Sequence, residues 1–190
     1  MLFRSVTRHF ADSLSFFKAA NPQEYASLID VGSGAGFPGM PIKIARNDMS
    51  VTLLDSTNKR IAFLQEVAEK LGVEVNAVHS RAEEAAVKPE LREQFDFATA
   101  RAVAQLNVLS EYCLGFVKVG GSFVAMKGKL TDEELTEAKN AISVMGGKIA
   151  ERTVLELSDS SERSLLTINK ISQTPTQYPR CSAKMAKKPL

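Results

Sequence analysis

The sequence lacks several features that mark other classes of protein. Its 190 residues include two cysteines, Cys113 and Cys181, which are too few for a disulfide framework or a cysteine-based zinc site. No apolar run approaches the roughly 18 residues that cross a bilayer, and residues 1–10 lack the apolar core of a signal peptide. We therefore expect one domain over residues 1–190, in a reducing cytoplasm, with no metal ion and no membrane contact.

Acidic residues are also absent after Glu162. The segment from 170 to 190 carries a charge of +5 in a chain of net charge +2, which leaves −3 for residues 1–169. Its basic residues are Lys170, Arg180, Lys184, Lys187 and Lys188. A near-neutral body with a basic tail, residues 172–190, indicates a polyanionic partner. A frayed tail that is merely solvated explains the same charge.

What the chain does contain is an alternation of strand-like and helix-like segments. Short runs rich in β-branched and aromatic residues predict strands at 27–31, 51–55, 74–79, 95–100 and 121–127. Helical periodicity predicts helices over 38–46, 57–71, 103–116 and 131–145, after an N-terminal segment, residues 1–20, with a helix over 3–19. Such alternation indicates an α/β fold with a mostly parallel sheet and helices on both faces. A hairpin over 147–157 and 163–171 adds an antiparallel strand at the sheet edge, for seven strands in all.

The most informative segment is the glycine-rich turn after the first predicted strand. Gly32, Gly34 and Gly36 follow Asp30, between that strand and a helix. Glycine has no Cβ and adopts positive φ, so such a turn lets the backbone approach a ligand closely at the carboxyl end of a strand. The dinucleotide pattern G-x-G-x-x-G requires a third glycine at position 37, where Phe37 stands. The turn therefore favours S-adenosylmethionine (SAM), with a dinucleotide as the alternative cofactor.

Acids at the ends of two strands support the same cofactor. Asp30 could attract the SAM ammonium, directly or through water, and Asp55 could accept hydrogen bonds from both ribose hydroxyls, as it also could in an NAD enzyme. Asp30 could equally be a turn-forming residue, and Asp55 a helix N-cap. After the third strand, a backbone N–H near Ala82 and the side chain of Glu83 could meet the adenine edge. Glu83 also fits the first turn of a helix.

Longer stretches of the chain resemble one family. They are DVGSGAGFPGMPIKI (30–44), LLDSTNKRIAFL (53–64), RAE (81–83), FATARAVAQLNVLSEYCL (97–114), GGSFVAMKG (120–128) and the closing YPR and KKPL. These stretches are similar to the bacterial GidB type, the small-subunit ribosomal RNA guanine-N7 methyltransferases, over roughly residues 8–190. The resemblance implies a Rossmann-like class I SAM-dependent methyltransferase fold. It also implies methylation of N7 of guanine 527, in the 530 loop of 16S rRNA, with 16S rRNA or the small ribosomal subunit as partner and a monomeric enzyme.

The resemblance also implies site residues. The SAM site would use Gly32, Phe37, Asp55, Ser56, Ala82, Glu83 and Arg101, and His9 matches the family motif His-Phe-x-Asp-Ser-Leu. The family usually carries further helical sequence ahead of His9, so we expect a shorter N-terminal region here. Thr57 stands where leucine is more usual, and the tail lacks the glycine and proline commonly found between YPR and KKPL.

The chemistry of guanine N7 limits what the protein must supply. N7 has a lone pair and no proton, so its methylation requires no general base, and positioning should dominate catalysis. We expect Arg101, after the fourth strand, to hold guanine O6 or a flanking phosphate, and Lys127, ending the fifth, to lie beside the same opening. An arginine paired with a core carboxylate is the alternative for Arg101. Candidate RNA contacts are His9, Arg60, Arg180, Lys184, Lys187 and Lys188.

Two other functions fit the same sequence. The first is a SAM-dependent methyltransferase that acts on another substrate. The second is a SAM-binding protein without catalysis, which binds RNA or assists ribosome assembly.

Overall fold

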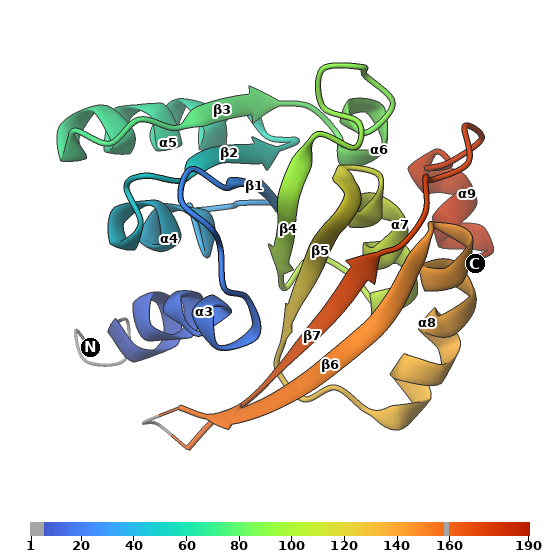
Figure 1. Ribbon diagram of the computed structural model, residues 1–190. Coiled ribbons are helices and arrows are strands. Elements are labelled where there is room, and N and C mark those ends of the chain that lie inside the picture. Colours follow the sequence, from blue (N-terminus) through green and yellow to red (C-terminus); the bar gives the residue numbers. More distant parts are fainter. Residues whose placement is uncertain (1–5, 158–159) are drawn as a thin grey trace.

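A seven-stranded sheet forms the centre of the computed structural model, which describes residues 6–157 and 160–190 (Figure 1). The strands are β1 (Ser27–Val31), β2 (Ser50–Asp55), β3 (Asn76–His79), β4 (Phe95–Arg101), β5 (Val117–Lys127), β6 (Gly147–Glu156) and β7 (Glu162–Lys170). Their order is β3-β2-β1-β4-β5-β7-β6, and β7 runs antiparallel to both of its neighbours while the other strands share one direction. The predicted fold class, with its antiparallel C-terminal strand, is confirmed.

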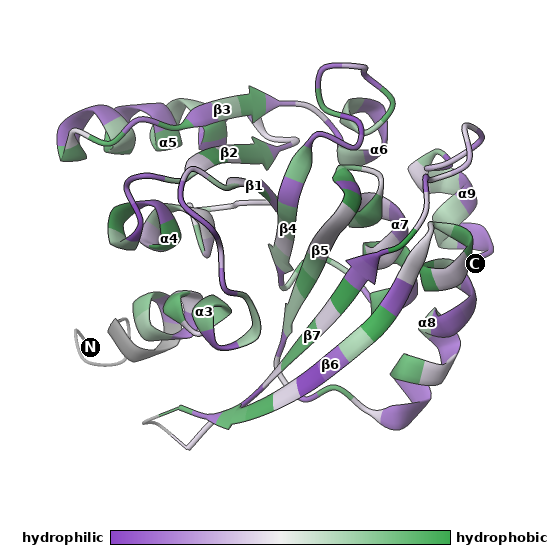
Figure 2. Cartoon of the chain, viewed as in Figure 1, coloured by the Kyte–Doolittle hydropathy of each residue, from purple (hydrophilic) through white to green (hydrophobic). Residues whose placement is uncertain are grey.

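Helices cover both faces of the sheet because each carries one apolar stripe. The helices are α2 (Asp12–Leu14), α3 (Phe16–Ala19), α4 (Gly39–Ala45), α5 (Asn58–Leu71), α6 (Ala82–Ala85), α7 (Leu106–Leu114), α8 (Asp132–Val144) and α9 (Ser182–Lys187), after a π-helical segment, η1 (Val6–Ala11). Residues of α3, α4 and α5 form one buried cluster with the sheet, and residues of α6, α7 and α8 form the other. Hydrophilic residues are frequent along α8 and β6, which close one side of the fold (Figure 2). None of the helices described has the length and apolar character required to cross a bilayer.

The element boundaries differ from the predicted ones where tertiary contacts decide them. β5 begins at Val117 instead of 121, because it continues through an irregularity in its pairing with β4 near Gly120, where φ is 91°. α7 begins at Leu106 instead of 103, because Ala102 has a φ of 57° and residues 102–105 form a loop. The predicted N-terminal helix is interrupted at Ser15, and its residues 3–5 lie outside the described part.

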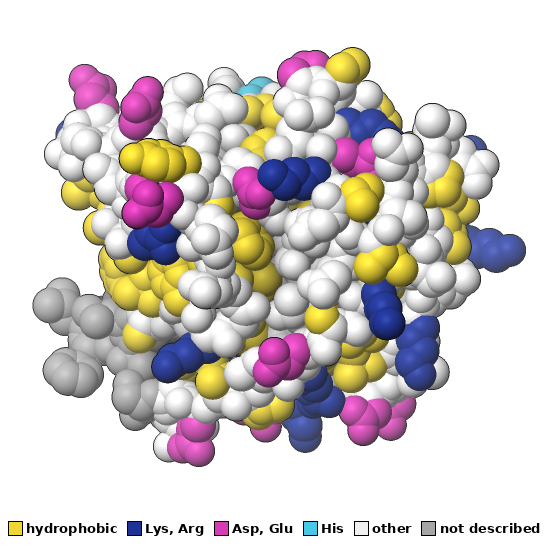
Figure 3. Space-filling model, in the orientation of Figure 1, with side chains coloured by type: hydrophobic (Ala, Val, Ile, Leu, Met, Phe, Trp, Pro, Cys, Tyr) yellow, Lys and Arg dark blue, Asp and Glu magenta, His cyan; other side chains and the backbone are white. Residues whose placement is uncertain are grey.

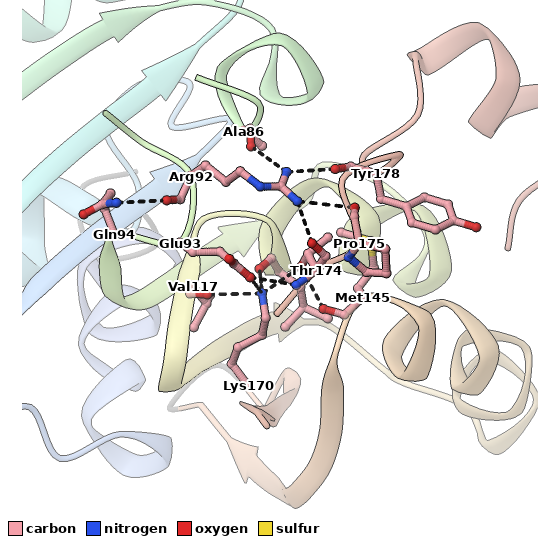
Figure 4. Close-up of polar contacts among 11 residues, drawn as sticks. Ala86, Arg92, Glu93, Gln94, Val117, Met145, Lys170, Thr174, Pro175 and Tyr178 are labelled. Atoms are coloured by element: carbon pink, nitrogen blue, oxygen red, sulfur yellow. Dashed lines mark hydrogen bonds and ion pairs between the residues drawn. The ribbon is translucent and has the colours of Figure 1, made fainter. Parts of the chain in front are cut away.

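The start of the basic tail is anchored to the body of the protein (Figure 4). Lys170 is buried, forms a 2.9 Å ion pair with Glu93, and donates hydrogen bonds to carbonyl groups that include that of Val117. Burial lowers the pKa of Lys170, and the bond to Glu93 opposes this shift. Arg92 donates to the carbonyl oxygens of Thr174, Pro175 and Tyr178, at 2.7, 3.3 and 2.8 Å. Residues 170–180 therefore form a docked segment, so the tail is not frayed there.

Candidate active site at the carboxyl ends of the strands

Two neighbouring cavities open where the parallel strands end, the position at which doubly wound sheets bind ligands. The first, which we call the Asp55 cavity, has a volume of about 160 Å³, and its walls include Gly32, Asp55, Ser56, Ala82, Glu83 and Tyr112. The second, the Arg101 cavity, has a volume of about 390 Å³, and its walls include His9, Asp12, Arg101, Leu109, Lys127 and Arg163. The loop after β4 separates the two, since Ala102 lines the Arg101 cavity and Val103 lines the Asp55 cavity.

The glycine turn after β1 has a shape that requires its glycines. Gly32, Gly34 and Gly36 have φ values of 76°, 59° and 95°, which side chains with a Cβ rarely adopt. A Cβ on Gly32 would lie 2.8 Å from Val103 Cγ2. The backbone N–H of Gly32 donates to the carbonyl of Leu54 at 2.8 Å, which holds the turn against the end of β2. The turn thus forms one wall of the Asp55 cavity with its backbone exposed to a ligand.

Asp55 supplies the carboxylate of this cavity and is held rigidly. Its side chain is 2% exposed, with Oδ2 accepting from Gly34 N at 3.0 Å and from Arg60 Nη1 at 3.3 Å. Its Oδ1 accepts from Thr57 N at 2.8 Å. A carboxylate offers about four acceptor positions, so it can still accept from a ligand hydroxyl. The accepting carboxylate of Asp55, the small cavity and the glycine backbone without a side chain together fit the ribose of an adenosine-containing cofactor.

Asp30 lies behind the glycine turn and not on a cavity wall. It is fully buried, and its Oδ2 accepts from Gly39 N at 2.9 Å. Its Oδ1 has no hydrogen-bond partner among the described residues. Burial raises the pKa of Asp30 to about 7, against the opposing hydrogen bonds from Gly39 and Ser33. Asp30 lines neither cavity, and its predicted interaction with the SAM ammonium, directly or through water, stays a prediction.

Arg101 stands at the centre of the Arg101 cavity, where three parts of the chain meet. Its Nη1 donates to Asp12 Oδ2 at 2.8 Å, and its Nη2 lies 3.5 Å from His9 Nδ1. Its guanidinium carbon lies 5.4 Å from the centroid of the Phe37 ring, within cation–π range, and the His9 ring is 5.1 Å from the same ring. Arg101 is thus paired with a buried carboxylate, which is the alternative role that the sequence left open for it. The side chain nevertheless remains 16% exposed at the cavity wall.

Lys127 also reaches this cavity, and its ammonium is engaged in holding the walls together. Its Nζ forms a 2.5 Å ion pair with Glu134 and donates to the carbonyl of Ala104 at 3.1 Å. The same Glu134 oxygen accepts from Leu106 N at 2.9 Å. Lys127 therefore fixes the loop after β4 to α8, which is a positioning role. Its proposed part in catalysis remains a prediction.

Comparison with known proteins decides the family. A family model described as rRNA small subunit methyltransferase G (GidB) matches residues 3–165. Proteins named Ribosomal RNA small subunit methyltransferase G, from Alkaliphilus metalliredigens and Clostridium perfringens, are 52% and 51% identical to this chain over 187 residues, which is 97% of this chain and 78% of theirs. The chain belongs to the GidB family. The resemblance predicted from the sequence is thereby confirmed.

Solved structures show the same fold at low sequence identity. YcgJ from Bacillus subtilis has a TM-score of 0.67 at 13% identity, over 86% of this chain and all of its own. TrmN from Thermus thermophilus has a TM-score of 0.65 at 15% identity, over 87% of this chain and 53% of its own. A geranyl diphosphate methyltransferase solved with SAM has a TM-score of 0.64 at 12% identity, over 85% of each chain. The GidB chain therefore shares the fold of these methyltransferases.

The structure groups the predicted site residues of this GidB chain into three sets. Gly32, Asp55, Ser56, Ala82 and Glu83 share the Asp55 cavity. His9, Arg101 and Lys127 share the Arg101 cavity, and the ring of Phe37 lies against His9 and Arg101. Gly34 and Gly36 shape the turn without lining either cavity. The predicted cofactor contacts therefore converge at one edge of the sheet, although their individual roles stay predictions.

The predicted RNA contacts of this GidB chain lie in different environments. Arg180 is engaged in a structural ion pair, with Nε 2.8 Å from Glu111 Oε1 and Nη2 2.7 Å from Oε2. Arg60 binds Asp55 instead of standing free on α5. Lys184, Lys187 and Lys188 are exposed on or beside α9. The tail that precedes them is anchored near Val117, at the amino end of β5 and so away from the cavities. The lysines remain available to a polyanion, whereas Arg180 and Arg60 have structural partners.

Two residues at the Arg101 cavity were missed from the sequence. Asp12 lies in the HFADSL stretch, where only His9 was singled out, and Arg163 is the second residue of β7. Arg163 Nε donates to Asp12 Oδ1 at 2.8 Å, across 151 positions of the chain. Local patterns carry no signal for such a contact. The family motif around Asp12 was the one available indication.

Proposed function

We propose that this protein transfers the methyl group of SAM to N7 of guanine 527 in the 530 loop of 16S rRNA. The observation that carries the proposal is the family match over residues 3–165, with relatives about half identical over nearly the whole chain. Those relatives are named as methyltransferases of the small-subunit ribosomal RNA. The nucleotide and the atom come from the family resemblance. They agree with a cavity whose described polar residues can position a base, since attack by the N7 lone pair requires no general base.

The Asp55 cavity would hold the adenosine part of the cofactor. Asp55 would accept hydrogen bonds from the ribose hydroxyls, and the wall formed by Ala82 and Glu83 would face the adenine edge. The backbone of Gly32, which lines this cavity, would lie against the ligand. When bound, SAM supplies a methyl group on a positively charged sulfur. The residues of the cavity bind and orient the cofactor and exclude water from it.

The Arg101 cavity would hold the acceptor guanine. N7 attacks with its own lone pair, so the protein must hold that atom in line with the methyl group at about 3–3.5 Å. Arg101 would donate to guanine O6 and leave N7 free, since a hydrogen bond to N7 would occupy the reacting lone pair. The ring of Phe37, already in contact with Arg101, offers a face for the base. Nothing in this step requires a proton to be removed.

The proposed partner is 16S rRNA, free or within the small subunit, bound by a monomer in the cytoplasm. Acidic and basic side chains are interspersed on the face shown in Figure 3, with several lysine and arginine side chains along the side where α8 and α9 lie. Lys184, Lys187 and Lys188 are exposed there. Phosphate contacts from such lysines would make RNA binding weaken as salt concentration rises.

The test is transfer of a tritiated methyl group from SAM to 16S rRNA and to 30S subunits that lack the modification. The methylated position is then mapped by borohydride and aniline cleavage, which cuts RNA at 7-methylguanine. We expect one cleavage site, at guanine 527. Methyl incorporation elsewhere would favour another substrate. SAM binding by calorimetry without any incorporation would favour the non-catalytic RNA-binding or assembly protein.

A further inference from the structure

Arg163 and Arg101 face one cavity through a shared carboxylate. Asp12 is 2% exposed, and its two oxygens are divided between the arginines: Oδ1 accepts from Arg163 Nε and Oδ2 from Arg101 Nη1, each at 2.8 Å. The three residues come from α2, β4 and β7 and all line the Arg101 cavity. Asp12 therefore holds two guanidinium groups side by side at the cavity wall.

Among the described side chains that form ion pairs at this wall, cations outnumber carboxylates. The cationic side chains are Arg101, Arg163 and Lys127, and the carboxylates bound to them are Asp12 and Glu134. The space is partly enclosed, and Arg101 and Arg163 are 16% and 20% exposed. Low exposure strengthens attraction for an anion, because water screens the charge less.

Arg163 also has hydrogen-bonding capacity to spare. A guanidinium carries five N–H donors, and Arg163 uses Nε for Asp12 and Nη1 for the carbonyl of Glu162. Among the described residues, none accepts a hydrogen bond from its Nη2. A guanidinium oriented by one carboxylate, with remaining donors beside a cavity, matches the forked geometry of a phosphate group.

The sheet order separates Arg163 from the cofactor turn. β4 and β5 lie between β1, which leads into the glycine turn, and β7, which carries Arg163. Three strand spacings correspond to about 14 Å. The backbone of Arg163 is therefore remote from the turn, and its side chain lines the cavity proposed for the acceptor, so an anion of the acceptor suits Arg163 better than the carboxylate of the cofactor.

We propose that Arg163, oriented by Asp12 beside Arg101, forms a binding subsite for a phosphate group of the acceptor nucleotide. This inference rests on the proposed guanine acceptor and adds a specific anchor for its backbone. The phosphate would set the depth at which the base enters the cavity. Asp12, which binds both arginines, would hold the two guanidinium groups in fixed positions while the nucleotide binds.

The experiment compares guanosine 5′-monophosphate with guanosine as ligands of the protein saturated with S-adenosylhomocysteine, by NMR titration. Charge-assisted hydrogen bonds to one phosphate should make the monophosphate bind about tenfold or more tightly than the nucleoside. Arg163→Ala should remove most of this advantage and leave guanosine binding unchanged. Arg163→Lys, which keeps the charge without the fork, should retain part of it. Arg152→Ala is the matched control. Arg152 lies on the outer strand β6, pairs with Asp132 of α8, and lines neither cavity.

Binding of S-adenosylhomocysteine checks that each variant is folded, and Arg163→Gln replaces Arg163→Ala if the alanine variant is not. Equal affinity of the wild-type protein for nucleotide and nucleoside would overturn the proposal. So would an advantage that survives Arg163→Ala, or a loss confined to S-adenosylhomocysteine affinity, which would assign the subsite to the cofactor carboxylate. An advantage that depends on Arg163 in a protein that methylates no rRNA would uphold the subsite and refute the proposed function. Methylation of guanine 527 by a protein without this advantage would uphold the proposed function and refute the subsite.

Discussion

Replacement of Arg180 by alanine should destabilise the protein strongly, although Arg180 lies in the tail. The side chain of Glu111 on α7 is 1% exposed, and Arg180 binds both of its oxygens, at 2.8 and 2.7 Å. The backbone N–H of residue 180 also donates to Glu111, at 2.8 Å. Arg180→Ala would leave a buried carboxylate with that backbone donor but without its counter-charge.

The magnitude follows from the burial of Glu111. Removing one partner of a buried ion pair costs about 3–5 kcal/mol. We expect the lower end, about 3 kcal/mol, because Arg180 itself is 20% exposed and the backbone N–H still donates. For a chain of this size, 1 kcal/mol corresponds to about 2–4 °C in melting temperature. The expected decrease is therefore about 6–12 °C.

Urea and thermal unfolding followed by circular dichroism measure this change. Arg152→Ala, which breaks an exposed pair with Asp132, should cost less than about 1 kcal/mol. Adding Glu111→Gln to Arg180→Ala should recover part of the loss, because a neutral amide is cheaper to bury than a carboxylate. If Arg180→Ala were as stable as Arg152→Ala, the ion pair would not anchor the tail and the reasoning would be wrong.

Three further predictions concern the turn and its acids. Asp55→Asn should weaken SAM binding about tenfold or more in calorimetry, because the amide replaces an acceptor oxygen and a charge that face the ribose; unchanged affinity would remove Asp55 from the cofactor site. The raised pKa of Asp30, about 7 against 3.8, means that the folded state holds its proton more tightly, so this group's contribution to stability is complete below pH 4 and decreases as the pH rises to about 7. At about 1.4 kcal/mol per pH unit, the loss of unfolding free energy reaches about 4 kcal/mol. Urea titrations across this pH range should therefore show a decrease for the wild type that Asp30→Asn lacks. The same pH dependence in both proteins would contradict the shifted pKa. Gly36→Ala should cost about 1–3 kcal/mol in the same assay, because φ is 95° and the new Cβ would lie 2.9 Å from Leu64 Cδ2; a neutral effect would show that the turn relaxes freely.

The sequence predicted the layers of the fold because each layer has a local period. Strands such as 27–31 and helices such as 57–71 are recognisable from spacing alone, and their ends agree with the structure to within a residue. The glycine turn was predictable for a related reason, since positive φ and close approach select one residue type. Gly72, with φ of 63° at the end of α5, follows the same rule.

The rest depended on contacts that no local pattern encodes. The shared pairing of Asp12 with Arg101 and Arg163 joins positions up to 151 residues apart. Arg180 looked like an RNA contact because its charge is visible in the sequence, whereas its buried partner Glu111 looks like an ordinary helix acid. The start of α7 also shifted, because Glu134 on α8 binds Leu106 N. Side-chain partners across the fold, and not propensities, decided these features.

A single-atom substitution in the RNA tests the central claim most directly. A 16S rRNA fragment that carries the 530 loop is prepared with guanine at position 527 and, in a matched copy, with 7-deazaguanine, in which a C–H group replaces N7. Methyl transfer from tritiated SAM is then measured for both. The account predicts transfer to the guanine RNA and none to the 7-deazaguanine RNA. Equal transfer to both would contradict it, because the methyl group would then reside on another atom.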